Sequence, residues 1–145
     1  TPVEALDAGY DFFRIHSYEL APDSFGHGAH RGGAGFYRRY EILRDGVTFS
    51  MYADHFRHPP EGFRGGSPGA CGHARIIRGE QTIELTSKGA HPLRKGDIVE
   101  LLLGGGGGYG APADRDHGDV ERDLADGLLR PETARRIYAR REAAE

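Results

Sequence analysis

The sequence predicts a mainly β protein that ends in a pair of short helices. Apolar and polar residues alternate through the first two thirds of the chain, glycine-rich stretches separate the alternating segments, and the C-terminal segment changes to helical spacing. We expect short antiparallel strands in a sandwich or barrel-like sheet, with extended, polyproline-II-like glycine segments between them. One domain is predicted over 1–145, β-rich over 1–112 and helical over 118–143.

Two turn signals pair some of the expected strands. The strand-like segments are 11–20, 35–43, 47–56, 74–79, 81–89 and 97–103. Asp45-Gly46 is a strong hairpin signal and predicts that the second and third segments pair. Gly79-Glu80 predicts a second hairpin between the fourth and fifth segments.

The C-terminal helices are predicted from apolar spacing and from one proline. Val120, Leu124 and the pair at 128–129 recur at helical intervals. Pro131 then opens a second helix, because proline is well tolerated in a first turn. We expect the two helices to join near Gly127.

Composition limits the classes of function. Leu, Ile, Val and Phe make up about one fifth of the chain, near the lower edge for a self-sufficient core. A thin core with 23 glycines suggests a fold completed by a partner. The balance of 19 basic and 22 acidic residues gives no electrostatic footprint for nucleic-acid binding.

Cysteine usage and hydropathy favour the cytoplasm. The single cysteine, Cys71, rules out an internal disulfide and fits a reducing compartment. No apolar run approaches the ~20 residues of a membrane span, and no secretory signal is visible. We therefore expect a cytoplasmic protein that does not bind membranes.

The glycine run "LLLGGGGGYGAP" at 101–112 allows two interpretations. Its match to G-x-G-x-x-G lacks the helix that a dinucleotide site requires directly afterwards, and a phosphate site is disfavoured. Glycines without β-carbons can instead lie extended in close backbone contact. The residues assigned this structural role are Gly32, Gly33, Gly104, Gly105, Gly106, Gly107, Gly108 and Gly110.

Histidines and the cysteine are candidates for metal ligands and for a catalytic group. His55, His58, Cys71 and His73 could close a tetrahedral site, but their spacing matches no zinc module. We expect no bound metal. Asp54, His55 and Cys71 could be drawn as a thiol triad, yet no signature flanks the cysteine. No residue is assigned a catalytic role.

Arginines flank the glycine clusters. They are Arg31, Arg38, Arg39, Arg57 and Arg64. Arginine there could bind a carboxylate or phosphate, but it is also enriched at protein interfaces. We favour the interface interpretation.

Four blocks in order carry a family resemblance. They are "ALDAGYDFFRIHSYELAPDSFGHGAHRGGAGFYRRYEIL", "HPPEGFRGGSPGA", "KGAHPLRKGDIVELLLGGGGGYGAP" and "ERDLADGLLRPETARRIY". Together they resemble the C-terminal portion of the hydantoinase B / oxoprolinase family, over nearly the whole chain. The glycine framework of that family is kept, whereas its usual Gly-Arg-Tyr-Arg-Gly-Gly is Gly-Ala-His-Arg-Gly-Gly at 28–33.

The resemblance implies a small accessory subunit of an ATP-dependent ketone carboxylase, most like that of acetophenone carboxylase. Such a complex forms benzoylacetate-type 3-oxoacids from ketone, bicarbonate and ATP. The implied partners are larger hydantoinase A-like, ATP-binding subunits and hydantoinase B-like subunits in a hetero-oligomer. ATP and a divalent metal, Mg or Mn, are expected in those partners, with no cofactor bound by this chain and no activity of the chain alone.

The same blocks leave a second enzyme class open. The chain could belong to an ATP-dependent amidohydrolase of the hydantoinase, 5-oxoprolinase or lactamase type. In that case His30, His55 or Cys71 could lie near the substrate ring.

Overall fold

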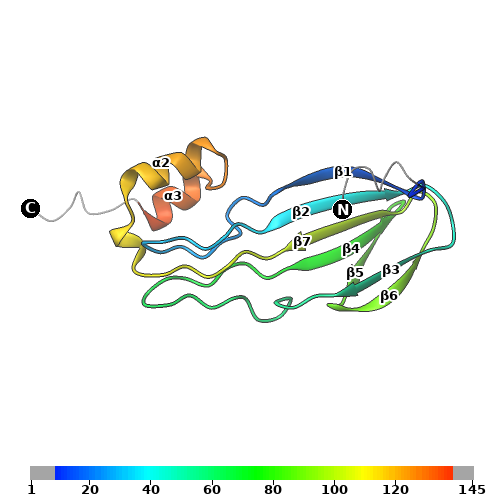
Figure 1. Ribbon diagram of the computed structural model, residues 1–145, viewed down its shortest axis with the longest axis horizontal. Helices are drawn as coiled ribbons and strands as arrows, with labels where there is room; N and C mark the ends of the chain where they lie inside the picture. Colours follow the sequence, from blue (N-terminus) through cyan, green and yellow to red (C-terminus); the bar gives the residue numbers. More distant parts are fainter. Residues whose placement is uncertain (1–8, 139–145) are drawn as a thin grey trace, which may run out of the picture. The chain divides into compact units, whose positions relative to one another are not determined.

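The computed structural model describes residues 9–138, and these residues divide into two compact units (Figure 1). The strand unit comprises 9–19, 37–54 and 73–102. The glycine unit comprises 20–36, 55–72 and 103–138. One domain over 1–145 therefore stays a prediction.

A five-stranded sheet forms most of the strand unit. Its strands, in spatial order, are β1 (Phe13–Leu20), β2 (Phe36–Ile42), β7 (Ile98–Leu103), β4 (His73–Arg78) and β5 (Gln81–Leu85). Figure 1 shows β7 between β2 and β4, although it is the last strand in the sequence. β4 runs antiparallel to both β5 and β7. The mainly β prediction is therefore confirmed, with open sheets and no closed barrel among the described residues.

The hairpin predicted around Gly79-Glu80 is present, with Arg78 opposite Gln81. Gly79 lies at the tip with a φ of 58°, in the left-handed region that favours glycine. The local turn signal and the sheet pairing agree at this position.

The prediction of a hairpin around Asp45-Gly46 is wrong. The chain turns there, and Gly46 has a φ of 81°. However, β3 (Val47–Tyr52) pairs antiparallel with β6 (Lys88–Leu93) in a separate two-stranded sheet. The sequence pattern does not predict β6, because Pro92 and Gly89 are unfavourable in a strand interior. In a two-stranded sheet both strands are edges, where proline is tolerated.

Side chains hold the strand unit together. Ile76 on β4 lies opposite Val99 on β7, and both are almost fully buried. The buried apolar residues of this unit are Ile42, Met51, Ala74, Ile76, Leu85, Leu93 and Val99. Burying a large apolar side chain contributes about 1.5–3 kcal/mol, which makes these contacts the main stabilising term of the unit.

Buried carboxylates on and beside β7 are paired with arginines. Arg78 donates two hydrogen bonds to Asp97, at 2.9 and 2.6 Å, and these hold the pKa of Asp97 below its ordinary value. Glu100 accepts from Arg75 and, at 2.6 Å, from the Tyr37 hydroxyl. Burial and the bond to Glu100 raise the pKa of Tyr37 to about 12. Burial alone would raise the pKa of Glu100, but these hydrogen bonds outweigh it and lower that pKa.

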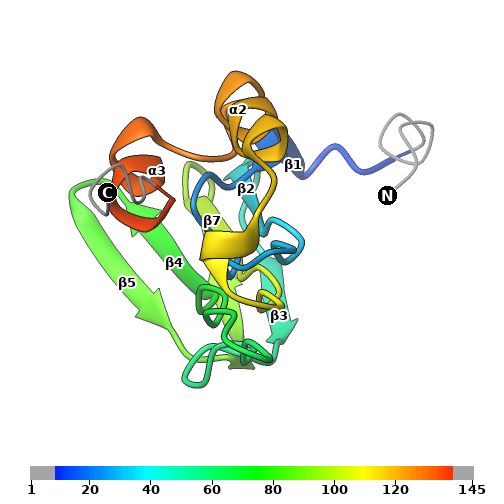
Figure 2. The same cartoon turned by 90° about the vertical axis from the view of Figure 1, so that its left-hand side faces the viewer.

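The helices lie in the glycine unit. They are η1 (Pro112–Asp114), α2 (His117–Ala125) and α3 (Pro131–Ile137), and Figure 2 shows the chain passing through them in this order. Asp116 caps α2 by accepting from the backbone N–H of Asp119. Gly127 turns the chain between the helices with a φ of 70°. The predicted helical pair is confirmed, while residues 139–143 of the predicted range lie outside the described residues.

A small apolar cluster joins the helices to the rest of the glycine unit. Val120, Leu129 and Ala134 pack with Phe25. Leu124 on α2 and Leu128 in the turn after it lie against this cluster. Within residues 9–138, no helix is long and apolar enough to cross a membrane.

Candidate functional site

Three glycine-rich segments of the glycine unit are joined by backbone hydrogen bonds. The segment 104–110 pairs with 24–33, for example through Gly26 N–H to Gly106 O at 2.7 Å. It also pairs with 61–70, for example through Gly108 N–H to Ser67 O at 2.9 Å. Tyr109 forms bridges to both neighbours, at His30 and at Phe63. We call these three bonded segments the glycine layer.

Most glycines of the layer have no room for a side chain. A Cβ added at Gly107 would overlap the carbonyl oxygen of Glu61, and one added at Gly32 would overlap that of Gly106. Gly104, Gly105 and Gly108 meet backbone carbonyls in the same way. Backbone held by hydrogen bonds on both sides cannot move aside cheaply, so only glycine fits these positions.

Three of the glycines assigned a structural role differ from this pattern. A Cβ at Gly33 would meet nothing within 4 Å, and one at Gly106 would lie 3.4 Å from the nearest atom, Gly33 N. Gly110 has a φ of 76°, so its constraint is conformational. Glycine is therefore sterically required at some positions of the run and not at Gly106.

Three backbone amides of the glycine run, those of Gly105, Gly106 and Gly108, already donate to carbonyl oxygens. Gly105 N–H donates to Ser24 O at 3.1 Å, Gly106 N–H to Gly33 O at 2.9 Å, and Gly108 N–H to Ser67 O at 2.9 Å. A phosphate-binding loop needs such amides to point at the ligand. Here they point at carbonyl oxygens, so this geometry suits packing and not phosphate binding.

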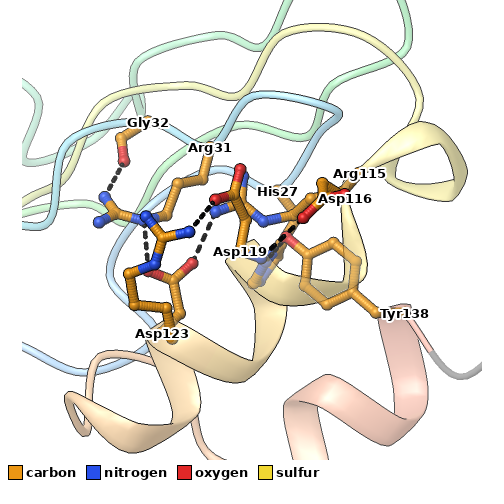
Figure 3. Close-up of polar contacts among 9 residues, drawn as sticks. His27, Arg31, Gly32, Arg115, Asp116, Asp119, Asp123 and Tyr138 are labelled. Carbon is orange, nitrogen blue, oxygen red and sulfur yellow. Dashed lines mark hydrogen bonds and ion pairs between the residues drawn. The ribbon is translucent and has the colours of Figure 1, made fainter.

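A buried ion-pair cluster ties the glycine layer to α2 (Figure 3). Asp123 is only 5% exposed. Its two carboxylate oxygens accept from Arg31 Nε at 2.9 Å and from Arg115 Nη2 at 2.7 Å. Arg31 also donates to the carbonyl of Gly32, at 3.0 Å. Without these partners, burying the charged carboxylate would destabilise the folded state.

His27 and Tyr138 form a second polar contact at the helices (Figure 3). The His27 ring nitrogen Nδ1 lies 2.9 Å from the Tyr138 hydroxyl. Burial lowers the pKa of His27 and raises the pKa of Tyr138. Both groups are therefore held in their neutral forms at neutral pH.

Exposed aromatic side chains gather on the glycine layer. Phe63 is 66% exposed and Tyr109 is 44% exposed, with ring centres 6.1 Å apart. The Arg64 guanidinium lies 5.9 Å from the Tyr109 ring centre, and the His30 ring lies 6.2 Å from it. We call these four residues the aromatic patch. Aromatic residues and arginine are the types enriched in protein interfaces.

The residues considered as metal ligands do not form a described site. His55 Nδ1 lies 3.0 Å from the carbonyl oxygen of His58, and both belong to the glycine unit with Cys71. His73 belongs to the strand unit, on β4. Across residues 9–138, no three His, Cys, Asp or Glu side chains are grouped so that they could hold a metal. Of the drawn triad, Asp54 belongs to the strand unit, whereas His55 and Cys71 belong to the glycine unit.

The arginines predicted to flank the glycine clusters lie in different environments. Arg31 is used inside the glycine unit and Arg64 lies in the aromatic patch, whereas Arg38 and Arg39 lie on β2. Sequence reasoning missed Arg115, which precedes α2, and Asp123, which lies on it. The signal that could have found Asp123 is its position on the apolar side of α2, three residues after Val120.

These observations define a β-rich module whose glycine layer is held by backbone contacts and is joined to a helical pair by side chains. Residues 1–112 match the Hydantoinase B/oxoprolinase family. The chain belongs to this family, as the four sequence blocks predicted.

Three similar proteins illustrate the range of the family. The chain is 34% identical to a putative B-type subunit of a D-/L-hydantoinase from Pseudomonas sp. (strain NS671), over 92% of this chain and 23% of that protein. It is 42% identical to the acetophenone carboxylase delta subunit of Aromatoleum aromaticum, over 44% of this chain and 10% of that protein. The crystal structure of ATP-dependent caprolactamase from Pseudomonas jessenii matches with a TM-score of 0.80 and 26% identity, over 94% of this chain and 24% of that one.

The match concerns part of each relative. The chain spans about a quarter of the length of the hydantoinase subunit and of the caprolactamase chain. Family and fold therefore apply to this chain directly, whereas activity, substrate and partners of the larger proteins do not.

Proposed function

We propose that this chain is a structural part of an ATP-dependent enzyme complex, in the manner of hydantoinase B-type subunits. The observation that carries the proposal is the glycine layer, in which the amides of Gly105, Gly106 and Gly108 are bonded to carbonyls and most glycines are closed in by neighbouring backbone. A layer built in this way is suited to holding a fixed shape, and these three amides are not free to bind a nucleotide. The chain alone is expected to have no ATPase, carboxylase or amidase activity.

The first candidate reaction is the carboxylation of a ketone to a 3-oxoacid of the benzoylacetate type, with bicarbonate and ATP. The similarity to the acetophenone carboxylase delta subunit favours it. In this proposal ATP and Mg or Mn are bound by larger hydantoinase A-like and B-like subunits. The present chain then contributes a fixed surface to the assembly and no cofactor ligand.

The second candidate is the ATP-dependent opening of a cyclic amide. The similarities to the hydantoinase subunit and to caprolactamase favour it, and they cover more of the chain. The two candidates share the same structural role for this chain and differ only in the reaction of the assembled enzyme.

The aromatic patch is the surface that we assign to subunit contact. Phe63 supplies a largely exposed ring, and Arg64 and Tyr109 add a cation and a phenol beside it. Truncation of a central aromatic residue of an interface costs about 2 kcal/mol or more in binding free energy.

The test is to purify the tagged chain from its own cells with its bound subunits. The complex is then assayed for ATP-dependent incorporation of labelled bicarbonate into ketones and for ATP-dependent hydrolysis of hydantoin, 5-oxoproline and caprolactam. We expect one activity in the complex, none in the isolated chain, and loss of the larger subunits from Phe63→Ala. Turnover by the isolated chain would contradict the proposal, as would a complex unaffected by Phe63→Ala.

A further inference from the structure

The strand unit contains an apolar cavity that the proposed function does not use. Its volume is about 330 Å³. The five-stranded sheet contributes Phe13, Tyr40 and Leu101 to its wall, and the two-stranded sheet contributes Val47, Phe49 and Leu93. A volume of this size is at the lower end of the range of small-molecule sites, which are typically ~300–1,000 Å³ and mainly apolar.

Aromatic rings supply much of the wall. The ring centres of Phe12 and Phe13 are 5.1 Å apart at an interplanar angle of 64°. Those of Phe13 and Tyr40 are 5.7 Å apart at 74°. These edge-to-face contacts fix the rings relative to one another and leave a rigid surface against which an aryl or alkyl group can pack.

A cation also lines this apolar space. Arg38, on β2, donates to the Tyr18 hydroxyl at 2.6 Å and to the Tyr40 hydroxyl at 3.4 Å. Its guanidinium carbon lies 4.2 Å from the centre of the Tyr18 ring. These contacts with two phenols orient the guanidinium. A positioned guanidinium in an apolar wall complements a carboxylate, which it can bind through two parallel hydrogen bonds.

We propose that this cavity binds a small monocarboxylate with an aryl or short alkyl body. The body fills the space between the two sheets, and the carboxylate pairs with Arg38. The inference rests on the strand unit alone and does not depend on the reaction of the assembled complex.

The binding test uses the full 145-residue chain and two probes of equal shape. 3-Phenylpropanoate carries the carboxylate, and 3-phenylpropanamide replaces it with a neutral group. We expect saturable binding of the carboxylate by calorimetry, with NMR shifts at the methyl groups of Val47, Leu93 and Leu101. The amide should bind at least about tenfold more weakly, because it cannot form an ion pair with Arg38.

A matched pair of variants separates this site from general charge effects. Arg38→Met should weaken binding of 3-phenylpropanoate at least about tenfold. Arg39→Met, at the next position on β2, should leave it unchanged, because Arg39 lies 3.6 Å from Glu100 and does not line the cavity. Val47→Phe should abolish binding by filling the space. If Arg38→Met does not fold, the two probes with the unaltered chain decide the question.

Three results would overturn the proposal. They are no saturable binding of 3-phenylpropanoate, equal affinity for the acid and the amide, or equal effects of Arg38→Met and Arg39→Met on affinity. The first would identify the cavity as an incompletely filled core, and the other two would show that Arg38 does not hold a carboxylate there.

Discussion

The strand unit and the glycine unit are stabilised in opposite ways. In the strand unit, buried side chains such as Ile76 and Val99 meet across paired strands. In the glycine layer, backbone meets backbone, and the space that a side chain would need is mostly taken by carbonyl oxygens. A side-chain core tolerates substitution by residues of similar volume, whereas a position closed by backbone tolerates no β-carbon at all. The low content of large apolar residues is therefore compatible with a folded glycine unit.

The largest effect should come from a single methyl group in the glycine layer. Gly107→Ala places a Cβ against the carbonyl of Glu61, whereas Gly106→Ala places one at ordinary contact distance from Gly33 N. We expect the first to lower the free energy of unfolding by about 4 kcal/mol or more and the second by less than about 1 kcal/mol. Urea denaturation of the two variants measures the difference. Equal stabilities would show that the run is a mobile loop.

A smaller loss of stability should follow from removing the Asp123 charge, which joins the glycine layer to α2. Asp123→Asn leaves Arg115, whose side chain is 6% exposed, without its carboxylate partner. We expect a destabilisation of about 3 kcal/mol. The control is Asp119→Asn on the same helix, which removes an exposed pair with Arg122 and should cost less than about 1 kcal/mol. If both variants behave alike in thermal denaturation, the buried cluster is not what holds α2.

The smallest effect should be a pH dependence specific to the glycine unit. Burial lowers the pKa of His27 below 6.5, so the unfolded chain takes up this proton at a higher pH than the folded chain. The stabilising contribution is therefore complete above pH 6.5 and is lost as the pH falls below that value, at no more than about 1.4 kcal/mol per pH unit. His27→Gln should remove this contribution to the change of unfolding free energy with pH. Unfolding free energies at several pH values between about 5 and 7.5 measure it, and identical slopes for both proteins would contradict the assignment.

Local patterns predicted every strand except β6, and long-range contacts decided which strands pair. Gly79-Glu80 joins two strands that do pair, because both strands find their buried neighbours in the same sheet. Asp45-Gly46 forms an equally good turn, but β3 pairs instead with β6. A turn residue fixes only the direction of the chain, whereas burial across the sheet fixes the partner strand.

For the candidate site too, the sequence predicted local features but not long-range contacts. Five consecutive glycines without a following helix indicated close backbone packing, since that pattern lacks the parts of a phosphate loop. The room for a Cβ at Gly106 could not be predicted, because it depends on which backbone atoms face each glycine. The pairing of Arg31 with Asp123 joins residues far apart in the chain, so no local spacing signals it.

Amide hydrogen exchange of the glycine run tests the central claim most directly. The backbone amides of Gly105, Gly106 and Gly108 each donate to a carbonyl oxygen of a neighbouring segment. We predict that in the folded chain they exchange at least ~100-fold more slowly than in the urea-unfolded chain, and that ATP or inorganic phosphate leaves their NMR shifts unchanged. Rapid exchange, or a saturable shift of these amides with ATP or phosphate, would contradict a layer held by backbone packing.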